Sequence, residues 1–261
     1  MLAEILAHLR TQPSRTGSMI VTLYGDAIVP RGGSLALSSL IDIFRGLGIE
    51  DGVVRTAVSR LAADGWLIRS KRGRNSFYAI SPSAAAATEA ATPRIYGPIS
   101  DTWDGHLRLA IDPGAERQSL LDAGWATVHP GVLIATTGPS ALTSTGTPEA
   151  LRALAARAWP LAGLAARYHT FLATFPADIA VTEADAIRLR LLLIHEFRRI
   201  ALRDPALPRA LLPADWPGHP ARARAATLYA SILPLSEHWL DTNATTETGP
   251  LPHAIAPRRF G

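Results

Sequence analysis

The stretch from Ser34 to Tyr78 constrains the fold of this chain more than any other part of it. It reads SLALSSLIDIFRGLGIEDGVVRTAVSRLAADGWLIRSKRGRNSFY, with two apolar-periodic runs, a glycine stop after each, and two short strand-like runs around KRGRN. Apolar residues spaced by three and four predict amphipathic helices, and alternating runs joined by a polar turn predict a hairpin. We therefore expect two helices and then a two-stranded hairpin, over residues 35–47, 51–63, 66–70 and 76–80.

A further helix is predicted upstream of this stretch. Apolar residues from Ile20 to Ile28 continue a helical pattern, and Pro30 with the following glycine pair ends it. Three helices followed by a hairpin is the element order of a winged helix-turn-helix, a DNA-binding module. A short amphipathic helix is also expected within residues 1–15.

Positive charge is concentrated in the same stretch. Residues 51–80 hold six basic and two acidic groups, whereas residues 99–261 hold 15 of each. A localised basic segment is typical of a surface that binds phosphates, although a solvated basic face on an ordinary helical domain is the alternative. The predicted DNA contacts are four side chains on helix 51–63 and four on the hairpin: Arg55, Thr56, Ser59, Arg60, Arg69, Lys71, Arg72 and Arg74.

The downstream pattern predicts an α+β protein with two more domains. Strand-like runs at 103–111 and 125–138 alternate with a helix at 116–124, which favours a small ferredoxin-like sheet. Residues 151–159 are ambiguous, because their composition favours a helix while that sheet requires a strand. Helices are then expected over 161–175, 182–202 and 221–240, with a short helix and a turn within 207–218 and a loose tail over 241–261. The expected domains are 1–82, a linker at 83–99 that can be helical, 100–159 and 160–261.

Composition excludes several classes of site. The chain has no cysteine, which removes disulfides and thiolate zinc sites and is typical of a cytoplasmic protein. No apolar run reaches the roughly 18 residues of a membrane span, and the N-terminus lacks a signal-peptide pattern. The eight histidines form no metal-binding pair, so we expect no metal and no cofactor.

Three aspartates keep an enzymatic alternative open. Asp101, Asp104 and Asp112 surround the first predicted strand of the middle domain, where a metal-dependent nuclease would need converging carboxylates. The sequence Asp112-Pro-Gly is more simply a turn that leads into a helix. We expect no catalytic residue here.

The helix at 182–202 places one arginine on its apolar face. On a helical wheel Arg190 lies in the middle of that face, and Arg198 lies near its edge. A buried guanidinium needs an anionic partner, which is either a protein carboxylate or the phosphate or carboxylate of a ligand. Trp216, in a proline-bounded turn, either packs in the core or lines an aromatic pocket.

Four runs together resemble the PaaX family of bacterial transcriptional regulators. They are LYGDAIVPRGG (23–33), VRTAVSRLAADGWL (54–67), HEFRR (195–199) and LPADWPG (212–218). The resemblance implies a winged helix-turn-helix, a ferredoxin-like (Cas2-like) middle domain and a helical C-terminal domain. It also implies a dimeric repressor of genes for aromatic-acid breakdown, released by an acyl-CoA such as phenylacetyl-CoA. The recognition-helix role would fall on Arg55, Thr56, Ser59 and Arg60, and the wing role on Arg69, Lys71, Arg72 and Arg74. The short Thr- and Gly-rich loop at 138–150 departs from the family pattern.

The sequence thus predicts a cytoplasmic, homodimeric repressor that binds double-stranded operator DNA and an acyl-CoA effector. The residues predicted for that effector are Arg190, Arg198 and Trp216. Two alternatives are a Cas2-like metal-dependent nuclease with a DNA-targeting domain and a ligand-independent architectural DNA-binding protein.

Overall fold

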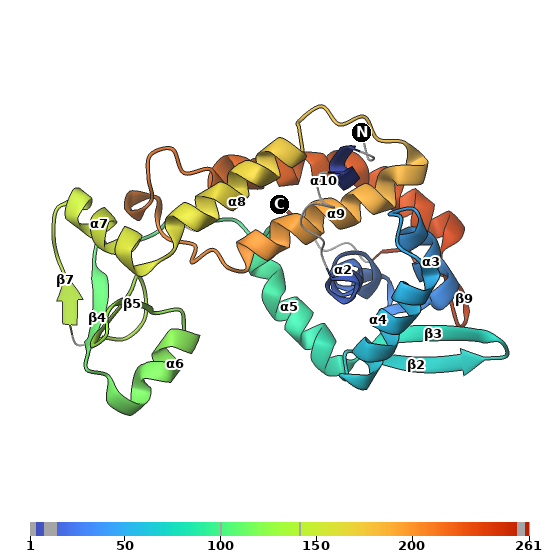
Figure 1. Ribbon diagram of the computed structural model, residues 1–261, viewed down its shortest axis with the longest axis horizontal. Coiled ribbons are helices and arrows are strands. Elements are labelled where there is room, and N and C mark those ends of the chain that lie inside the picture. The colour runs from blue at the N-terminus through green and yellow to red at the C-terminus, as the bar shows by residue number, and fades with distance from the viewer. Residues whose placement is uncertain (1–3, 8–14, 100, 141, 255–258, 261) are drawn as a thin grey trace. The chain divides into compact units, whose positions relative to one another are not determined.

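The computed structural model of the chain describes residues 4–7, 15–99, 101–140, 142–254 and 259–260. These residues form two compact units, and Figure 1 labels many of their helices and strands. The first unit comprises the described residues of Met1–Gly97, Phe171–Arg199 and Ala221–Gly261, and the second those of Pro98–Thr170 and Ile200–Pro220. The domain boundaries expected along the sequence stay a prediction.

The first unit opens with a helix that is longer than predicted. α2 (Thr16–Leu23) continues into a π-helical turn, η1 (Tyr24–Ile28), and a 3-10 turn, η2 (Val29–Arg31). The predicted helix over 20–28 is therefore confirmed in place, but it begins four residues earlier. It ends at Gly32, which adopts a left-handed φ of 89°. Of the helix expected within residues 1–15, residues 4–7 are helical and residues 8–14 lie outside the described part.

A short strand that the sequence pattern did not predict precedes the second helix. Residues Ser34–Ala36 form β1, so the predicted helix over 35–47 is instead α3 (Leu37–Arg45). β1 pairs with the hairpin and makes a three-stranded sheet of order β1-β3-β2 in place of the predicted two strands. The turn before it requires glycine, because Gly33 has a φ of 75° and a Cβ there would lie 2.9 Å from Ile80 Cγ2.

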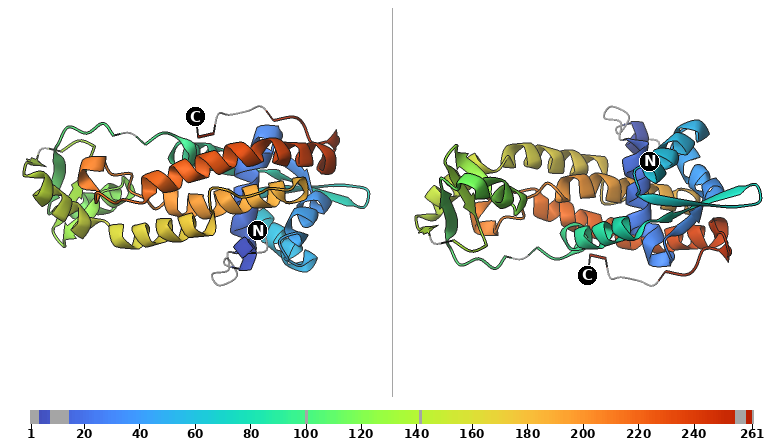
Figure 2. Two further views of the ribbon diagram at one scale, coloured as in Figure 1. Left: turned by 90° about the horizontal axis from the view of Figure 1, so that it is seen from above. Right: turned by 90° about the horizontal axis from the view of Figure 1, so that it is seen from below.

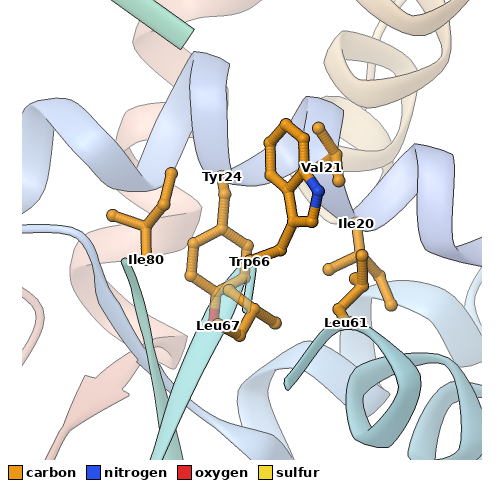
Figure 3. A pocket seen from close by; sticks show the side chains of 7 residues that line it. All are labelled: Ile20, Val21, Tyr24, Leu61, Trp66, Leu67 and Ile80. Carbon is orange, nitrogen blue, oxygen red and sulfur yellow. The ribbon is translucent and has the colours of Figure 1, made fainter. Parts of the chain in front are cut away.

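The third helix and the hairpin are confirmed. α4 spans Asp51–Ala63 as predicted, and the strands β2 (Leu67–Arg72) and β3 (Asn75–Ile80) are each slightly longer than expected. The inner side of α4 is fixed by Val54 and Val58, which are fully buried. This core contains a gap of about 10 Å³ between α2, η1, α4 and the sheet. Figure 3 shows the side chains that line it. Such a gap holds at most about one water molecule, so it is not a ligand site. The side chains around it are Ile20, Val21, Tyr24, Leu61, Trp66, Leu67 and Ile80.

The segment expected as a linker forms a helix within the first unit. α5 (Pro82–Tyr96) begins where the Ser81 hydroxyl accepts the backbone N–H of Ala84. It packs so closely on η1 that a Cβ at Gly25 would lie 2.8 Å from Thr88 Cγ2. The glycine in the LYGD run is therefore explained by this helix contact.

The last elements of the chain include an unpredicted hairpin. α8 (Leu161–Thr174), α9 (Glu183–Ala201) and α10 (Gly218–Asn243) confirm the three predicted helices, while the short helix within 207–218 is the 3-10 turn η4 (Arg209–Leu211). The expectation of a loose tail over 241–261 is wrong for its described part up to Leu251. There β8 (Thr245–Thr246) and β9 (Gly249–Pro250) pair, and Leu251 is buried.

The second unit is built around a four-stranded antiparallel sheet. Its strands are β4 (Leu107–Ile111), β5 (Ala126–His129), β6 (Val132–Ala135) and β7 (Leu142–Ser144), in the order β5-β6-β4-β7. Two helices accompany the sheet, α6 (Arg117–Asp122), which follows the 3-10 turn η3 (Gly114–Glu116), and α7 (Pro148–Ala158).

The ambiguity at 151–159 is resolved as a helix. Thr147 caps α7 by accepting the Ala150 N–H, and Pro148 occupies the first helical turn. The fourth strand therefore precedes the second helix, and the element order is β-α-β-β-β-α in place of the expected β-α-β-β-α-β. Across the described residues, no helix is both long and apolar enough to cross a membrane.

Candidate nucleic-acid interface

The outer face of α4 presents the four side chains predicted for DNA. Arg55, Thr56, Ser59 and Arg60 line an open, shallow hollow of about 410 Å³ together with Ala63. They lie on the solvent side of the helix, because Val54 and Val58 fix the opposite side in the core. An exposed helix face of this kind fits the major groove of DNA.

The hairpin carries the other four predicted side chains. Arg69, Lys71, Arg72 and Arg74 are exposed, and Arg74 follows Gly73, whose left-handed φ of 59° makes the tight turn. Figure 2 shows the β2–β3 hairpin extending away from the helices of its unit. A projecting basic hairpin can reach phosphates beside a helix that lies in the groove.

The cations of this surface have no carboxylate partner among the described residues. In the described ranges, none of the six basic residues of α4 and the hairpin forms a salt bridge, and two of them make hydrogen bonds to neutral groups. Arg69 Nη2 donates to Ser76 Oγ at 3.1 Å, and Arg72 Nη1 donates to the backbone carbonyl of Glu247 at 2.7 Å. Uncompensated cations attract a polyanion.

The C-terminal β8–β9 hairpin contacts the β2–β3 hairpin, which we call the wing. The sequence pattern did not predict this contact. Glu247, in the turn between β8 and β9, accepts a 2.7 Å hydrogen bond from Ser70 Oγ through Oε2. Its backbone carbonyl accepts the bond from Arg72. The signal available in the sequence was the run Thr246-Glu-Thr-Gly249, whose residue types favour a turn.

Arg190 is saturated by protein groups. Its Nε donates to Asp26 Oδ2 at 2.6 Å, and Nη1 donates to Glu237 Oε1 and Ser236 Oγ. Its Nη2 donates to Tyr229 Oη and the Asp26 carbonyl. Burial alone would lower the pKa of Arg190, but its attraction to these partners outweighs burial and raises that pKa. All five N–H groups are used, so the anionic partners of Arg190 are protein carboxylates and none of its N–H groups is left for an effector.

The same buried cluster explains the LYGDAIVPRGG run. Asp26, 3% exposed, also accepts the Tyr96 hydroxyl at 2.7 Å and the Tyr229 hydroxyl at 3.1 Å. Arg31, 2% exposed, pairs with Glu237 and with Asp241 Oδ1 at 2.8 Å. Both charged residues of the run therefore hold the N-terminal helices against α9 and α10.

The two other residues predicted for an effector lie in different units. Arg198, in the first unit, donates weakly to Ser18 Oγ at 3.4 Å, and its buried Nε has no partner among the described residues. Burial lowers the pKa of Arg198. Trp216, in the second unit, packs edge-on against Tyr168 and borders an open hollow of about 590 Å³.

The three aspartates considered for a nuclease have other roles. Asp101 Oδ1 accepts the Arg209 N–H at 2.8 Å, and Asp104 pairs with Arg108. Asp112 has a left-handed φ of 45° in a turn. Within the described residues, no group of three or more His, Cys, Asp or Glu side chains is arranged to hold a metal ion.

Comparisons with known proteins match both ends of the chain. Residues 15–84 match the model of the PaaX-like protein family, and residues 159–242 match that of the PaaX-like protein C-terminal domain. The chain is 32% identical to the transcriptional repressor PaaX of Escherichia coli K12, over 94% of this chain and 89% of that protein. A solved structure of an uncharacterized protein from Mycobacterium tuberculosis is similar in fold, with a TM-score of 0.54 and 23% identity over 84% of this chain and 96% of that one.

Proposed function

The chain belongs to the PaaX-like protein family, and we propose that it is a sequence-specific, DNA-binding transcriptional repressor and not an enzyme. One observation carries the proposal. Four polar and cationic side chains occupy the outer face of α4, next to a hairpin whose cations have no carboxylate partner in the described structure. The similar protein of Escherichia coli is named as a transcriptional repressor.

The first unit supplies the proposed reading geometry, that of a winged helix-turn-helix. α4 enters the major groove, where Arg55 and Arg60 bind guanine edges and Thr56 and Ser59 bind bases or phosphates. The wing contacts phosphates through Arg69, Lys71, Arg72 and Arg74, which adds affinity without sequence information. A homodimer would present two such helices to successive major grooves, so the operator is expected to be nearly palindromic.

A small-molecule effector completes the proposal. The repressor would have one arrangement that binds DNA and another that does not. An acyl-CoA such as phenylacetyl-CoA would release it from DNA by binding more tightly to the second arrangement than to the first. Arg198 and Trp216 remain the proposed effector residues from the sequence. The sheet of the second unit would be a variant of the ferredoxin-like (Cas2-like) middle domain, since its strand order places the first and third strands at the centre. The protein is expected to work in the cytoplasm.

The experiment is a mobility-shift titration of the full chain on the intergenic DNA upstream of its gene. We expect a specific complex at nanomolar protein that unrelated DNA of equal length does not form, and its loss on addition of one acyl-CoA from a panel of thioesters. Equal binding to both DNAs at physiological salt would contradict sequence-specific recognition. Specific binding that no acyl-CoA alters would leave a ligand-independent DNA-binding protein. Cleavage of plasmid DNA with Mg²⁺ or Mn²⁺, lost in Asp112→Ala, would contradict the non-enzymatic proposal.

A further inference from the structure

The second unit contains an open hollow that the DNA-binding proposal does not use. Its volume of about 590 Å³ lies within the range of small-molecule sites, about 300–1,000 Å³. The first turn of α7, the 3-10 turn η4 and the segment leading into α10 surround it. Its polar lining residues are Arg152, Arg209, Asp215 and His219, and Trp216 supplies an aromatic side chain. We call it the LPADWPG hollow, because that run supplies much of its wall.

One side of the LPADWPG hollow is cationic. Arg209 is exposed, and its guanidinium has no hydrogen-bond or ion-pair partner among the described residues. Arg152 donates through Nε to the Pro148 carbonyl at 3.2 Å and through Nη2 to Glu149 at 3.3 Å, so a negative charge already faces part of it. Two arginines against the single lining carboxylate, Asp215, leave a site that favours an anion.

Backbone and histidine donors add to this preference. The hollow is bordered by the first turn of α10 at His219 and Pro220, whereas at the start of α7 Pro148 has no N–H and the Ala150 N–H is already accepted by Thr147. Free N–H groups at a helix start favour negative charge nearby. The Nε2 atom of His219 is also buried without a hydrogen-bond partner in the described structure. His219 lines the same hollow as the two arginines, so it would act on the same anion.

The other side of the LPADWPG hollow is apolar and held in place. The Trp216 ring packs edge-on against Tyr168 at 5.9 Å, and the Tyr168 hydroxyl donates to Asp204 at 2.7 Å. A Cβ at Gly218 would lie 2.4 Å from Trp216 Nε1, so the indole rests directly on this glycine. The tryptophan, resting on this glycine, thus forms a fixed apolar wall of the hollow together with Leu212 and Pro213.

We propose that the LPADWPG hollow binds a small organic anion, with its phosphate or carboxylate at Arg209 and Arg152 and a flat apolar group against Trp216. The ligand would be the effector of the repressor, and this part of the inference rests on the proposed function. Anion binding itself is independent of DNA and is measured without it.

The first experiment is isothermal titration calorimetry of the full chain with phenyl phosphate as the probe. Phenylacetate replaces the phosphate by a carboxylate, and inorganic phosphate and benzyl alcohol supply the anion and the ring alone. We expect phenyl phosphate or phenylacetate to bind more tightly than either fragment. The tighter of the two identifies the anionic group.

Variants locate the site. Arg209→Ala should weaken probe binding by about tenfold or more, the loss of a charge-assisted hydrogen bond. Arg157→Ala removes an exposed arginine of α7 that does not line the hollow, and Arg60→Ala removes one from the DNA-reading face, so both should leave probe binding unchanged. No detectable binding of either probe, or equal binding by Arg209→Ala and the unmodified chain, would overturn the site.

The link to DNA is tested on the same preparations by operator binding with and without phenylacetyl-CoA. We expect Arg209→Ala to bind DNA normally and to resist release by the thioester. DNA binding without anion binding would contradict the proposed anion site but not the proposed repressor function. Anion binding without DNA binding would contradict the repressor function but not the anion site. Normal release of Arg209→Ala by the thioester would overturn the effector role of the hollow.

Discussion

Replacing Asp26 by asparagine is predicted to destabilise the first unit strongly. The Asp26 carboxylate is 3% exposed and pairs with Arg190, which is itself 2% exposed. Breaking a buried ion pair by removing one partner costs about 3–5 kcal/mol, because it leaves a buried charge. Arg190 keeps Glu237, and the side-chain oxygen of the introduced asparagine can still accept from the Tyr96 and Tyr229 hydroxyls. We therefore expect the lower end of that range, about 3 kcal/mol.

Replacing Asp26 by alanine should destabilise the first unit more than replacing it by asparagine. Asp26→Ala also removes the acceptor of both tyrosine hydroxyls, each worth about 1 kcal/mol, which brings the loss to about 5 kcal/mol. For a unit of this size 1 kcal/mol shifts the unfolding midpoint by about 2–4 °C, so Asp26→Asn should lower Tm by about 6–12 °C.

The assay is thermal unfolding followed by far-ultraviolet circular dichroism. The matched control is Asp42→Asn, which makes the same change in an exposed pair with Arg45 and should barely move the midpoint. A Tm for Asp26→Asn within about 2 °C of the unmodified chain would refute the reasoning, because the cluster would then not hold the N-terminal helices in place.

Three further predictions concern His195, Glu247 and Arg72. Burial, with the charges of Arg198 and Arg199 nearby, lowers the pKa of His195 from 6.5 to about 3. Its neutral form therefore stabilises the fold above pH 6.5, and this contribution is lost as the pH falls toward 3. Urea unfolding should show a loss of about 2 kcal/mol between pH 7 and pH 5 that is absent in His195→Asn, and parallel pH profiles would contradict it. Glu247→Gln should strengthen binding to any DNA in anisotropy titrations, because it removes a negative charge beside the wing; weaker binding would show that the charge itself is needed. Arg72→Ala should flatten the dependence of log K on log salt by about one unit, and an unchanged slope would mean that Arg72 contacts no phosphate.

The sequence pattern correctly predicted helices and strands whose conformation depends mainly on residues close together in the chain. α4 was predicted with its observed ends because an apolar stripe, a glycine stop and an acidic first turn agree there. β1 was missed because three residues are too few for periodicity, and its strand state depends on pairing with β3. The helical state of α7 was predictable from Thr147 as a cap and Pro148 behind it, but the fold analogy competed with that local signal.

The sequence pattern could not identify which residues far apart in the chain contact one another. The wheel of α9 showed that Arg190 needs an anion, but its partner Asp26 lies 164 residues away and could not be chosen from pattern alone. The same holds for Glu247, whose contacts with the wing span 175 and 177 residues. The four predicted α4 side chains needed no such partner. Their place on the solvent side follows from the helical period and the burial of Val54 and Val58.

The central claim is that the exposed face of α4 reads DNA sequence. The most direct test is fluorescence anisotropy of the upstream intergenic duplex and a scrambled duplex with Arg55→Ala, Arg60→Ala and the control Arg157→Ala. We expect the first two variants to lose about 1–3 kcal/mol of binding free energy on the intergenic duplex and much less on the scrambled one, while the control matches the unmodified chain. Unchanged affinity of both Arg55→Ala and Arg60→Ala for the intergenic duplex would contradict the account.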